Sequence, residues 1–179
     1  MILEKAIKQA SEILKTHNIS THELDAQLML SNIMSVKRES LITNSKETIT
    51  KKIMDKYNIA IQRRLKKEPV AYITGKKEFW SEDFLVNYST LVPRPETELL
   101  IYEIIKFFKN KKINILDIGT GSGCIGITLA LEIPHSKVFA IDISEAALSI
   151  AKKNAELYNL KNIEFIKMDS SLPEIPPPL

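Results

Sequence analysis

Glycine is concentrated at one place in this chain, and that placement constrains the fold more than any other feature. Four of the five glycines among the 179 residues, Gly119, Gly121, Gly123 and Gly126, fall within eight positions. The apolar run 113–118 precedes them, and another apolar stretch follows. Glycine is used where the backbone turns tightly or approaches another group closely. The pattern therefore predicts a sharp turn from a buried strand into a helix, with room for a ligand at the turn.

The segments around this turn alternate between strand-like and helix-like patterns. Three short apolar runs, 113–118, 137–142 and 163–168, are typical of buried strands. One helix is expected from the glycine turn to about Glu132, and another, capped by Ser144, from there through Leu157. Strand–helix–strand–helix–strand at these lengths predicts an α/β domain with a doubly wound parallel sheet.

An acidic residue stands where such a domain would bind a nucleoside. Asp142 follows Gly123 by 19 residues and ends the second predicted strand. A carboxylate at this point can accept hydrogen bonds from the two hydroxyls of a ribose. The backbone of residues 119–123 would lie against another part of the same ligand. Together these residues predict a cofactor that contains a nucleoside.

Two classes of cofactor fit the spacing. Residues 121–126 also satisfy the pattern G-x-G-x-x-G, with Asp142 21 residues after its first glycine, so an NAD-binding oxidoreductase module is an alternative. Asp117, two residues before the first glycine of the loop, would repel the pyrophosphate of NAD. S-adenosylmethionine carries an ammonium group and no phosphate, so the electrostatics favour it.

The first 67 residues have a helical pattern. Apolar residues recur at helical spacing over residues 2–14, 24–33 and 49–65, which predicts three helices in a small bundle. Ser20 and Glu23 match a capping box, with a hydroxyl at the N-cap of the second helix and a carboxylate three residues later.

A different pattern follows the predicted bundle. Phe79 and Trp80, separated from residues 84–86 by Ser-Glu-Asp, predict a β-hairpin, and we expect Phe79 and Phe84 to lie in its core. The proline-containing, acidic stretch 93–98 is typical of a helix start, and that helix should continue through Phe108.

Composition and charge exclude several classes of protein. No apolar run approaches the ~18 residues that a membrane span needs. The single cysteine, Cys124, has no internal disulfide partner, so we expect a cytoplasmic protein. The net charge is only +3, and the basic cluster of Arg63, Arg64, Lys66 and Lys67 lacks interleaved aromatic residues. We therefore interpret that cluster as solvated helix ends rather than a nucleic-acid surface. The three histidines lack metal-ligand spacing, and no metal site is predicted.

Two segments together carry a resemblance to a known family. Residues 117–123 (DIGTGSG) with Asp142 resemble the cofactor loop of S-adenosylmethionine-dependent methyltransferases. Residues 93–98 (PRPETE), the aromatic hairpin before them and the stretch 69–75 (PVAYITG) resemble one branch, the release factor glutamine methyltransferases. The resemblance covers essentially the whole chain. The glycine motif alone would specify only the superfamily.

The resemblance implies a fold, a reaction and a set of site residues. The expected fold is α/β, with an N-terminal helical bundle followed by the first half of a Rossmann-like methyltransferase domain. The implied reaction transfers a methyl group from S-adenosylmethionine to the side-chain amide of a glutamine in class-I peptide chain release factors. Eight residues are expected to bind the cofactor, with the loop holding its methionine part, Asp142 its ribose, and the last two lying beside the adenine: Gly119, Thr120, Gly121, Ser122, Gly123, Asp142, Asp169 and Ser170.

The same resemblance divides the chain into three parts. Residues 1–67 would recognise the release factor, 68–95 would form a β-hairpin linker, and 96–179 would form an incomplete methyltransferase domain with three parallel strands. The Asn-Pro-Pro-Tyr motif with which the family aligns its substrate amide follows a fourth strand, which this sequence does not reach. No catalytic residue is therefore assigned, and the chain alone is expected to be inactive. A second chain that completes the domain, or a non-catalytic remnant that still docks on a partner, is an alternative.

Overall fold

A computed structural model describes residues 1–169 of the chain. It divides into two compact units, Met1–Thr74 and Gly75–Leu179, which we call the helical unit and the α/β unit. The residue pattern predicted that the helical part ends at residue 67. The structure extends it to Thr74, since a short helix packs back on the bundle there and Asn32 donates to the Thr74 carbonyl at 3.3 Å.

The helical unit contains five helices. Its core is made of apolar side chains on their facing sides, with Leu14, Leu30 and Tyr57 fully buried. The Tyr57 hydroxyl, which is buried among them, donates to the Ala26 carbonyl at 2.9 Å. The helices are α1 (Leu3–Thr16), α2 (His22–Met34), α3 (Arg38–Thr43), α4 (Lys51–Leu65) and α5 (Val70–Thr74).

Three of these helices were predicted, and two short ones, α3 and α5, were not. The predicted capping box at Ser20 is wrong. The N-cap of α2 is Thr21, and its side chain makes no capping hydrogen bond. The Thr21 hydroxyl instead donates to Asp25 Oδ2 at 2.8 Å. The hydroxyl at the actual N-cap thus bonds to a buried carboxylate one turn into the helix and not to the backbone.

The basic cluster at the end of α4 is not a solvated helix end, so that interpretation is wrong for its arginines. The Arg64 side chain is 17% exposed and pairs with Asp25 Oδ2 at 2.7 Å. Arg63 pairs with Glu68 and also donates to the Tyr72 carbonyl. These contacts tie α4 to α2 and to the chain that leads into α5. Charged side chains that the sequence pattern assigned to solvent therefore form contacts within the packed unit.

The α/β unit begins with a hairpin and continues into a parallel sheet. In its sheet the order is β3-β4-β5, with both pairs parallel. This arrangement confirms the predicted alternation of strand and helix, here as three adjacent parallel strands. The elements are β1 (Lys76–Phe79), β2 (Glu82–Leu85), α6 (Thr97–Phe108), β3 (Asn114–Ile118), α7 (Cys124–Glu132), β4 (Lys137–Asp142), α8 (Glu145–Leu157) and β5 (Ile163–Lys167).

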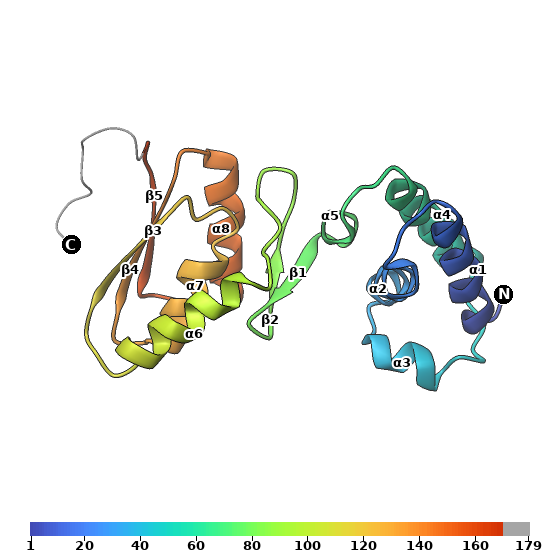
Figure 1. Ribbon diagram of the computed structural model, residues 1–179, viewed down its shortest axis with the longest axis horizontal. Helices are drawn as coiled ribbons and strands as arrows, with labels where there is room; N and C mark the ends of the chain where they lie inside the picture. The colour runs from blue at the N-terminus through green and yellow to red at the C-terminus, as the bar shows by residue number, and fades with distance from the viewer. Residues whose placement is uncertain (170–179) are drawn as a thin grey trace. The chain divides into compact units, whose positions relative to one another are not determined.

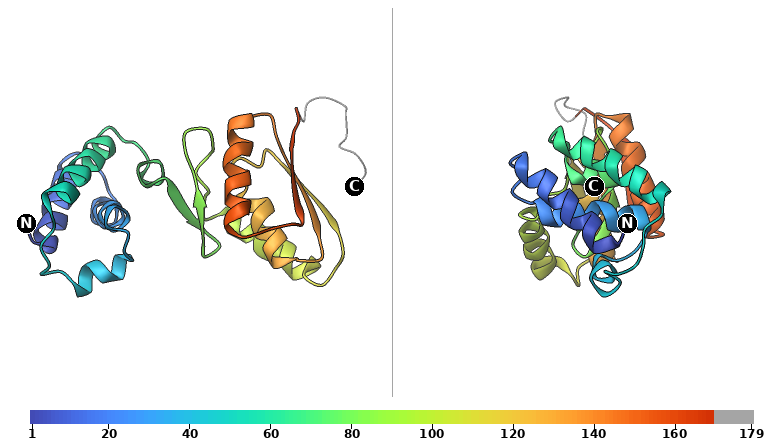
Figure 2. Two further views of the ribbon diagram at one scale, coloured as in Figure 1. Left: turned by 180° about the vertical axis from the view of Figure 1, so that it is seen from behind. Right: turned by 90° about the vertical axis from the view of Figure 1, so that its right-hand side faces the viewer.

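Helices α6, α7 and α8 lie on one side of this sheet, and the hairpin lies on the far side of those helices (Figures 1 and 2). The core of the unit contains side chains from the hairpin, the helices and the sheet, and Phe79, Phe84, Ile101 and Ile127 in it are fully buried. The Phe79 and Phe84 rings meet edge to face, 6.1 Å apart. The prediction that both phenylalanines belong to the core is confirmed.

The turn of the hairpin differs from the predicted one. Trp80 and Ser81 connect the strands, both with positive φ, while Glu82 and Asp83 belong to β2. A two-residue turn of this kind suits the right-handed twist of paired strands. The Trp80 backbone N–H donates to Glu98 Oε1 at 3.0 Å and its indole N–H to Glu132 Oε1 at 2.9 Å. These bonds to α6 and α7 hold the turn in its left-handed conformation.

Within the described residues, β3 pairs only with β4, so its other edge is open. Ile118 at the end of β3 is 59% exposed. No helix in residues 1–169 has the length and apolarity needed to cross a membrane.

Candidate cofactor site

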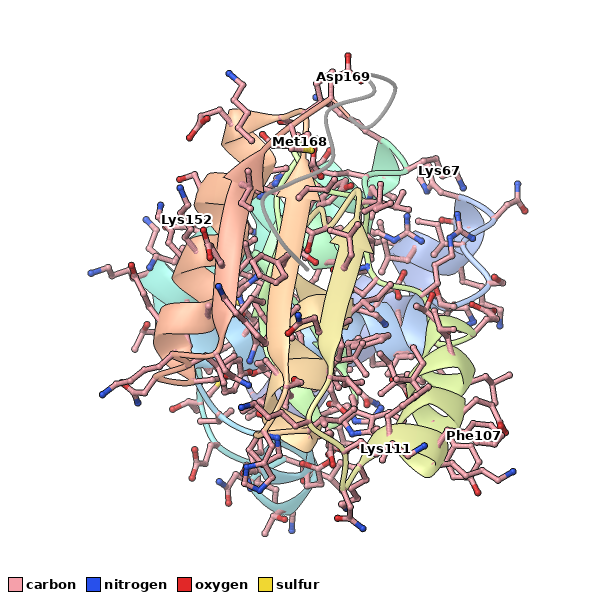
Figure 3. The ribbon with its side chains drawn as sticks, turned by 90° about the vertical axis from the view of Figure 1, so that its left-hand side faces the viewer. Lys67, Phe107, Lys111, Lys152, Met168 and Asp169 are labelled. Carbon is pink, nitrogen blue, oxygen red and sulfur yellow. The ribbon has the colours of Figure 1, made fainter. Side chains whose placement is uncertain are left out.

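The carboxyl ends of three parallel strands bring the predicted site residues to one edge of the sheet. Residues 119–123 follow β3, Asp142 ends β4, and Asp169 comes two residues after β5. Figure 3 shows Met168 and Asp169 at that end of β5. In open α/β sheets, ligands bind outside the carboxyl ends of the strands. Ser170, also expected beside the adenine, lies outside the described residues.

The loop after β3 depends on glycine for its backbone shape. Gly119, Gly121 and Gly123 have φ of +74°, +57° and +83°, values that side chains disfavour. A Cβ at Gly119 would meet nothing within 4 Å, whereas a Cβ at Gly123 would lie 2.7 Å from Ile127 Cδ1. Gly123 is thus needed for packing within the chain. Gly119 leaves open, exposed space beside the backbone.

The amide groups of this loop bond mainly within the chain. The N–H groups of Gly119 and Thr120 both donate to the Ile141 carbonyl, at 2.9 and 3.0 Å. The N–H of Gly123 donates to the Thr120 carbonyl at 2.8 Å. The loop is therefore bonded to the end of β4 before any ligand arrives, and these amides are not free for an anion.

Asp117 is buried beneath the loop and holds it from inside. Its Oδ2 accepts the Thr120 hydroxyl at 2.7 Å and the Gly126 N–H at 3.0 Å. Burial raises the pKa of this carboxyl, the two hydrogen bonds oppose that rise, and the charge of Asp142 adds to it. The acid therefore acts on the loop and on the first turn of α7.

Asp142 faces the loop from β4 with both carboxylate oxygens in use. Oδ2 accepts the Gly121 N–H and Oδ1 accepts the Ser144 N–H, both at 2.9 Å. A carboxylate has about four acceptor positions, so each oxygen retains room for one further donor. The side chain is held in one orientation at the carboxyl end of β4, as a pair of ribose hydroxyls would require.

The two other loop residues expected to bind the cofactor have buried side chains. Thr120 is 6% exposed, and its hydroxyl is used by Asp117. Ser122 is 2% exposed, and its carbonyl accepts from the side chain of Asn154 at 2.8 Å. Any contact from these two residues to a ligand would therefore come from their backbone. The role of all eight predicted residues in binding stays a prediction.

Two residues at this edge were not predicted as site residues. Ile143, directly after Asp142, is 64% exposed, which leaves an apolar surface beside the acid. Asn154 is fully buried in α8 and bonds to the glycine loop. A buried asparagine in the middle of an apolar helix face is a signal visible in the sequence, because such a group requires partners. The exposure of Ile143 becomes visible only in the fold.

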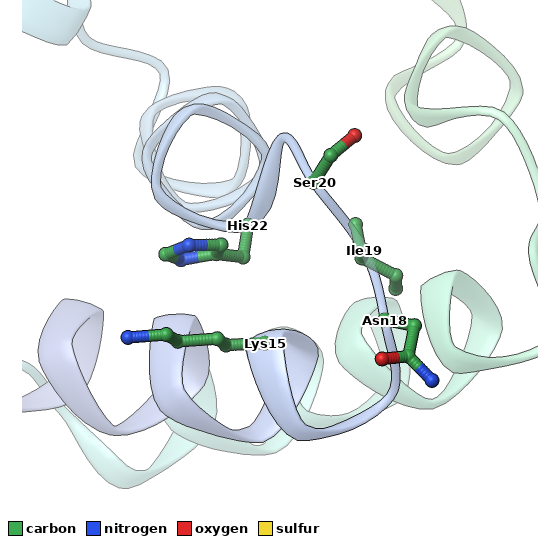
Figure 4. A pocket seen from close by; sticks show the side chains of 5 residues that line it. All are labelled: Lys15, Asn18, Ile19, Ser20 and His22. Atoms are coloured by element: carbon green, nitrogen blue, oxygen red, sulfur yellow. The ribbon is translucent and has the colours of Figure 1, made fainter.

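A separate hollow lies in the helical unit, between the end of α1 and the start of α2 (Figure 4). Lys15, Asn18, Ile19, Ser20 and His22 line it. Ser11 Oγ and His22 Nδ1 lie 2.8 Å apart beside it. None of its lining residues belongs to the loop site. In the described residues, no group of three or more His, Cys, Asp or Glu side chains could hold a metal ion.

Comparisons with known families agree with this division of the chain. Residues 5–75 match the PrmC N-terminal domain, and residues 109–174 match a methyltransferase domain. The second match falls on the strands and helices that carry the glycine loop. The class is thereby defined: the α/β unit carries a methyltransferase domain.

Relatives that are similar over nearly the whole chain indicate which family of methyltransferases is concerned. Release factor glutamine methyltransferases of Buchnera aphidicola from Schizaphis graminum and of Coxiella burnetii are 41% and 40% identical, each over 91% of this chain. The chain belongs to the release factor glutamine methyltransferase family. It spans 57% and 59% of the length of these two relatives. A solved S-adenosylmethionine-dependent methyltransferase from Aquifex aeolicus overlaps partially, with 29% identity over 45% of this chain and 41% of its own, and a TM-score of 0.37.

Proposed function

We propose that the α/β unit binds S-adenosylmethionine at the glycine loop, as part of an enzyme that methylates a glutamine side-chain amide in peptide chain release factors. The observation that carries the cofactor half of this proposal is the hydrogen bond between Asp142 and Gly121. It holds a ribose-binding carboxylate against an open glycine backbone. The release factor as substrate is supported by the names of the relatives.

The loop amides favour this cofactor over NAD. A pyrophosphate is bound by backbone N–H groups at a helix N-terminus. Here Gly119, Thr120, Gly121 and Gly123 donate within the chain. The N–H of Gly126 in the first turn of α7 is used by the Asp117 carboxylate.

The charges at the site also favour S-adenosylmethionine over NAD. Asp117 and Asp142 accept hydrogen bonds from backbone N–H groups and from the Thr120 hydroxyl, all of them uncharged donors. Of the two, Asp142 is only partly buried, and a carboxylate bonded to neutral groups at the carboxyl end of β4 favours a cationic ligand. S-adenosylmethionine carries an ammonium and a sulfonium, whereas NAD would bring two negative phosphates.

Each part of the cofactor has a counterpart at the edge of the sheet. The open backbone at Gly119 would accommodate the methionine part, and the free acceptor positions of Asp142 would take the ribose hydroxyls. Ile143 offers an apolar face for the adenine, and Asp169 follows the end of the neighbouring strand, β5. When bound, the cofactor supplies the methyl group. The described residues orient it, and none is assigned to the substrate amide.

Two further parts of the proposal concern partners. The helical unit would recognise the release factor, supported by its match to the PrmC N-terminal domain. The substrate side would be completed by the portion of the family's length that this chain does not span, whether in the same or in a second polypeptide. The open edge of β3 is a suitable place for another strand to pair.

A matched pair of glycine variants tests the cofactor site. Gly119 and Gly75 have nearly equal φ, +74° and +76°, and at both positions the space that a Cβ would take is free of neighbours within 4 Å. Alanine should therefore strain both backbones equally. We expect Gly119→Ala to weaken binding of S-adenosylhomocysteine by about tenfold or more, which is about 1.4 kcal/mol. Gly75→Ala should bind like the unchanged chain.

Titration calorimetry with S-adenosylhomocysteine and, in parallel, with NAD measures these affinities. Equal effects of the two substitutions on affinity would show that the ligand does not lie against the Gly119 backbone. Binding of NAD without S-adenosylhomocysteine would establish the oxidoreductase alternative. The substrate half is tested separately by capture of a purified class-I release factor on the immobilised chain, which should be lost when residues 1–74 are deleted.

A further inference from the structure

Asn154 connects two segments that the sequence keeps far apart. It lies on α8 and is fully buried. Its Oδ1 accepts the Leu85 N–H at 2.7 Å, and its Nδ2 donates to the Leu85 carbonyl at 3.0 Å and to the Ser122 carbonyl at 2.8 Å. One side chain thereby satisfies both backbone groups of a residue in β2 and a carbonyl of the glycine loop.

The two bonds to Leu85 resemble the pairing of a neighbouring strand. Within the hairpin, β2 pairs with β1 on one side, and Asn154 bonds to the backbone of Leu85. The next residue, Val86, bonds back to Gly75 at 3.0 Å. The end of β2 is therefore held between the first strand and α8. The chain that leaves this point continues through residues 87–96 into α6.

The bond to Ser122 extends this attachment to the loop. Ser122 is flanked by Gly121 and Gly123, both in left-handed conformation. Gly121 in turn donates to Asp142. Hydrogen bonds on either side of the covalently linked Gly121 and Ser122 thus connect the carboxylate proposed to hold the ribose to the backbone of the hairpin.

We propose that Asn154 is a positioning residue that couples the cofactor loop to the β1–β2 hairpin. This inference rests on the proposed cofactor site. With the loop occupied, Asn154 holds the end of β2 and the segment that follows it in a defined position beside the bound cofactor. The backbone of the hairpin is then expected to become more protected when the cofactor binds.

The chemistry of the amide suits this task. It presents one acceptor and two donors in one plane, and all are used. A leucine, which is branched at the same atom but has no polar groups, would leave three backbone groups without this partner. An aspartate would keep the bond to the Leu85 N–H but would set a carboxylate against two carbonyl oxygens.

A second asparagine provides a matched control. Asn162 Nδ2 also donates to two backbone carbonyls, those of Ala130 and Ser136, at 3.0 and 3.3 Å. These lie near the opposite end of the sheet from the glycine loop, at the end of α7 and just before β4. Asn154→Leu and Asn162→Leu each remove an asparagine that bridges backbone segments, and only the first separates the loop from the hairpin.

The test measures affinity and hydrogen exchange together on the full 179-residue chain and both variants. S-adenosylhomocysteine should slow amide exchange in residues 82–86 of the unchanged chain and of Asn162→Leu. In Asn154→Leu this slowing should be lost, and the dissociation constant should rise by about tenfold, against about twofold or less in the control. Equal melting temperatures of the two variants would show that their different affinity and exchange do not arise from a difference in stability.

The outcomes distinguish the inference from the function on which it rests. Absence of binding to the unchanged chain would refute the proposed cofactor site itself. Binding without slower exchange in residues 82–86 of the unchanged chain would overturn the coupling, and this measurement needs no variant to fold. Equal effects of the two substitutions on exchange and affinity would leave Asn154 only a structural role, which also overturns it.

Discussion

The Asp142 carboxylate accepts the backbone N–H of Gly121 at 2.9 Å, across a separation of 21 residues. The bond joins the end of β4 to the turn after β3. It places a negative charge beside a backbone that has no side chain. Because the same carboxylate is also held by the Ser144 N–H, its orientation is set in the protein without a ligand.

Removing the charge of Asp142 should lower the affinity for the cofactor more than it lowers the stability of the fold. In Asp142→Asn an amide can still accept one backbone N–H, but a ribose hydroxyl loses a charged acceptor. Hydrogen bonds to charged groups contribute about 1.5–3 kcal/mol, so affinity for S-adenosylhomocysteine should fall about tenfold to a hundredfold. Titration calorimetry measures the change, and Glu145→Gln, an exposed acid at the start of α8, is the control. Unchanged affinity in Asp142→Asn would contradict the assigned role.

Asp117 should make stability depend on pH in a defined direction. Burial is the main cause that raises the pKa of this carboxyl in the folded state. A raised folded pKa means that the stabilising contribution is complete below the unfolded pKa of about 3.9 and is lost as pH rises through the folded value. In Asp117→Asn the oxygen can still accept from Thr120 and Gly126, without ionisation. The variant should lose this part of the pH dependence, measured as melting temperature from about pH 4 to 8. An identical profile in both proteins would show that Asp117 contributes none of it.

The buried ion pair of the helical unit should be sensitive to loss of one partner. Arg64→Met leaves the carboxylate of Asp25, whose side chain is 6% exposed, without its ionic partner. Breaking a buried pair in this way costs about 3–5 kcal/mol. Lys106→Met, which removes an exposed pair with Glu103, should cost about 0.5 kcal/mol or less. Urea denaturation of both variants makes the comparison. A similar loss in both would mean that Arg64 is no more important than a surface charge.

The hairpin turn should be stabilised by glycine at its second position. Ser81 is exposed with φ +61°, a conformation that costs a side chain about 1–2 kcal/mol. After the greater chain entropy of glycine is subtracted, Ser81→Gly should gain about 0.5–1 kcal/mol. Ser89→Gly, another exposed serine but without positive φ, should lose stability. Thermal unfolding measures both. A loss in Ser81→Gly would mean that the serine makes compensating contacts in the turn.

The order of the elements and the position of the loop could be predicted from the residue pattern alone. Apolar runs of five or six residues between helices form the parallel strands, although only the central strand, β4, is buried as the pattern predicted. Glycines at 119, 121 and 123 occur where the backbone has positive φ. The N-cap at Ser144 was also predictable, since its hydroxyl accepts the Ala147 N–H three residues later. These features depend on local geometry, which is encoded over a few residues.

The partner that each polar group takes depends instead on the packed fold. Thr21 bonds to Asp25 instead of the backbone, Arg64 turns inward to the same acid, and Asp117 lies beneath the loop. The three bonds of Asn154 join segments 32 and 69 residues away. Such choices depend on which groups packing buries together, because a buried polar atom must find a partner wherever the fold provides one. Local patterns contain no information about that proximity, so the attachment of the hairpin to the cofactor loop emerged only from the fold.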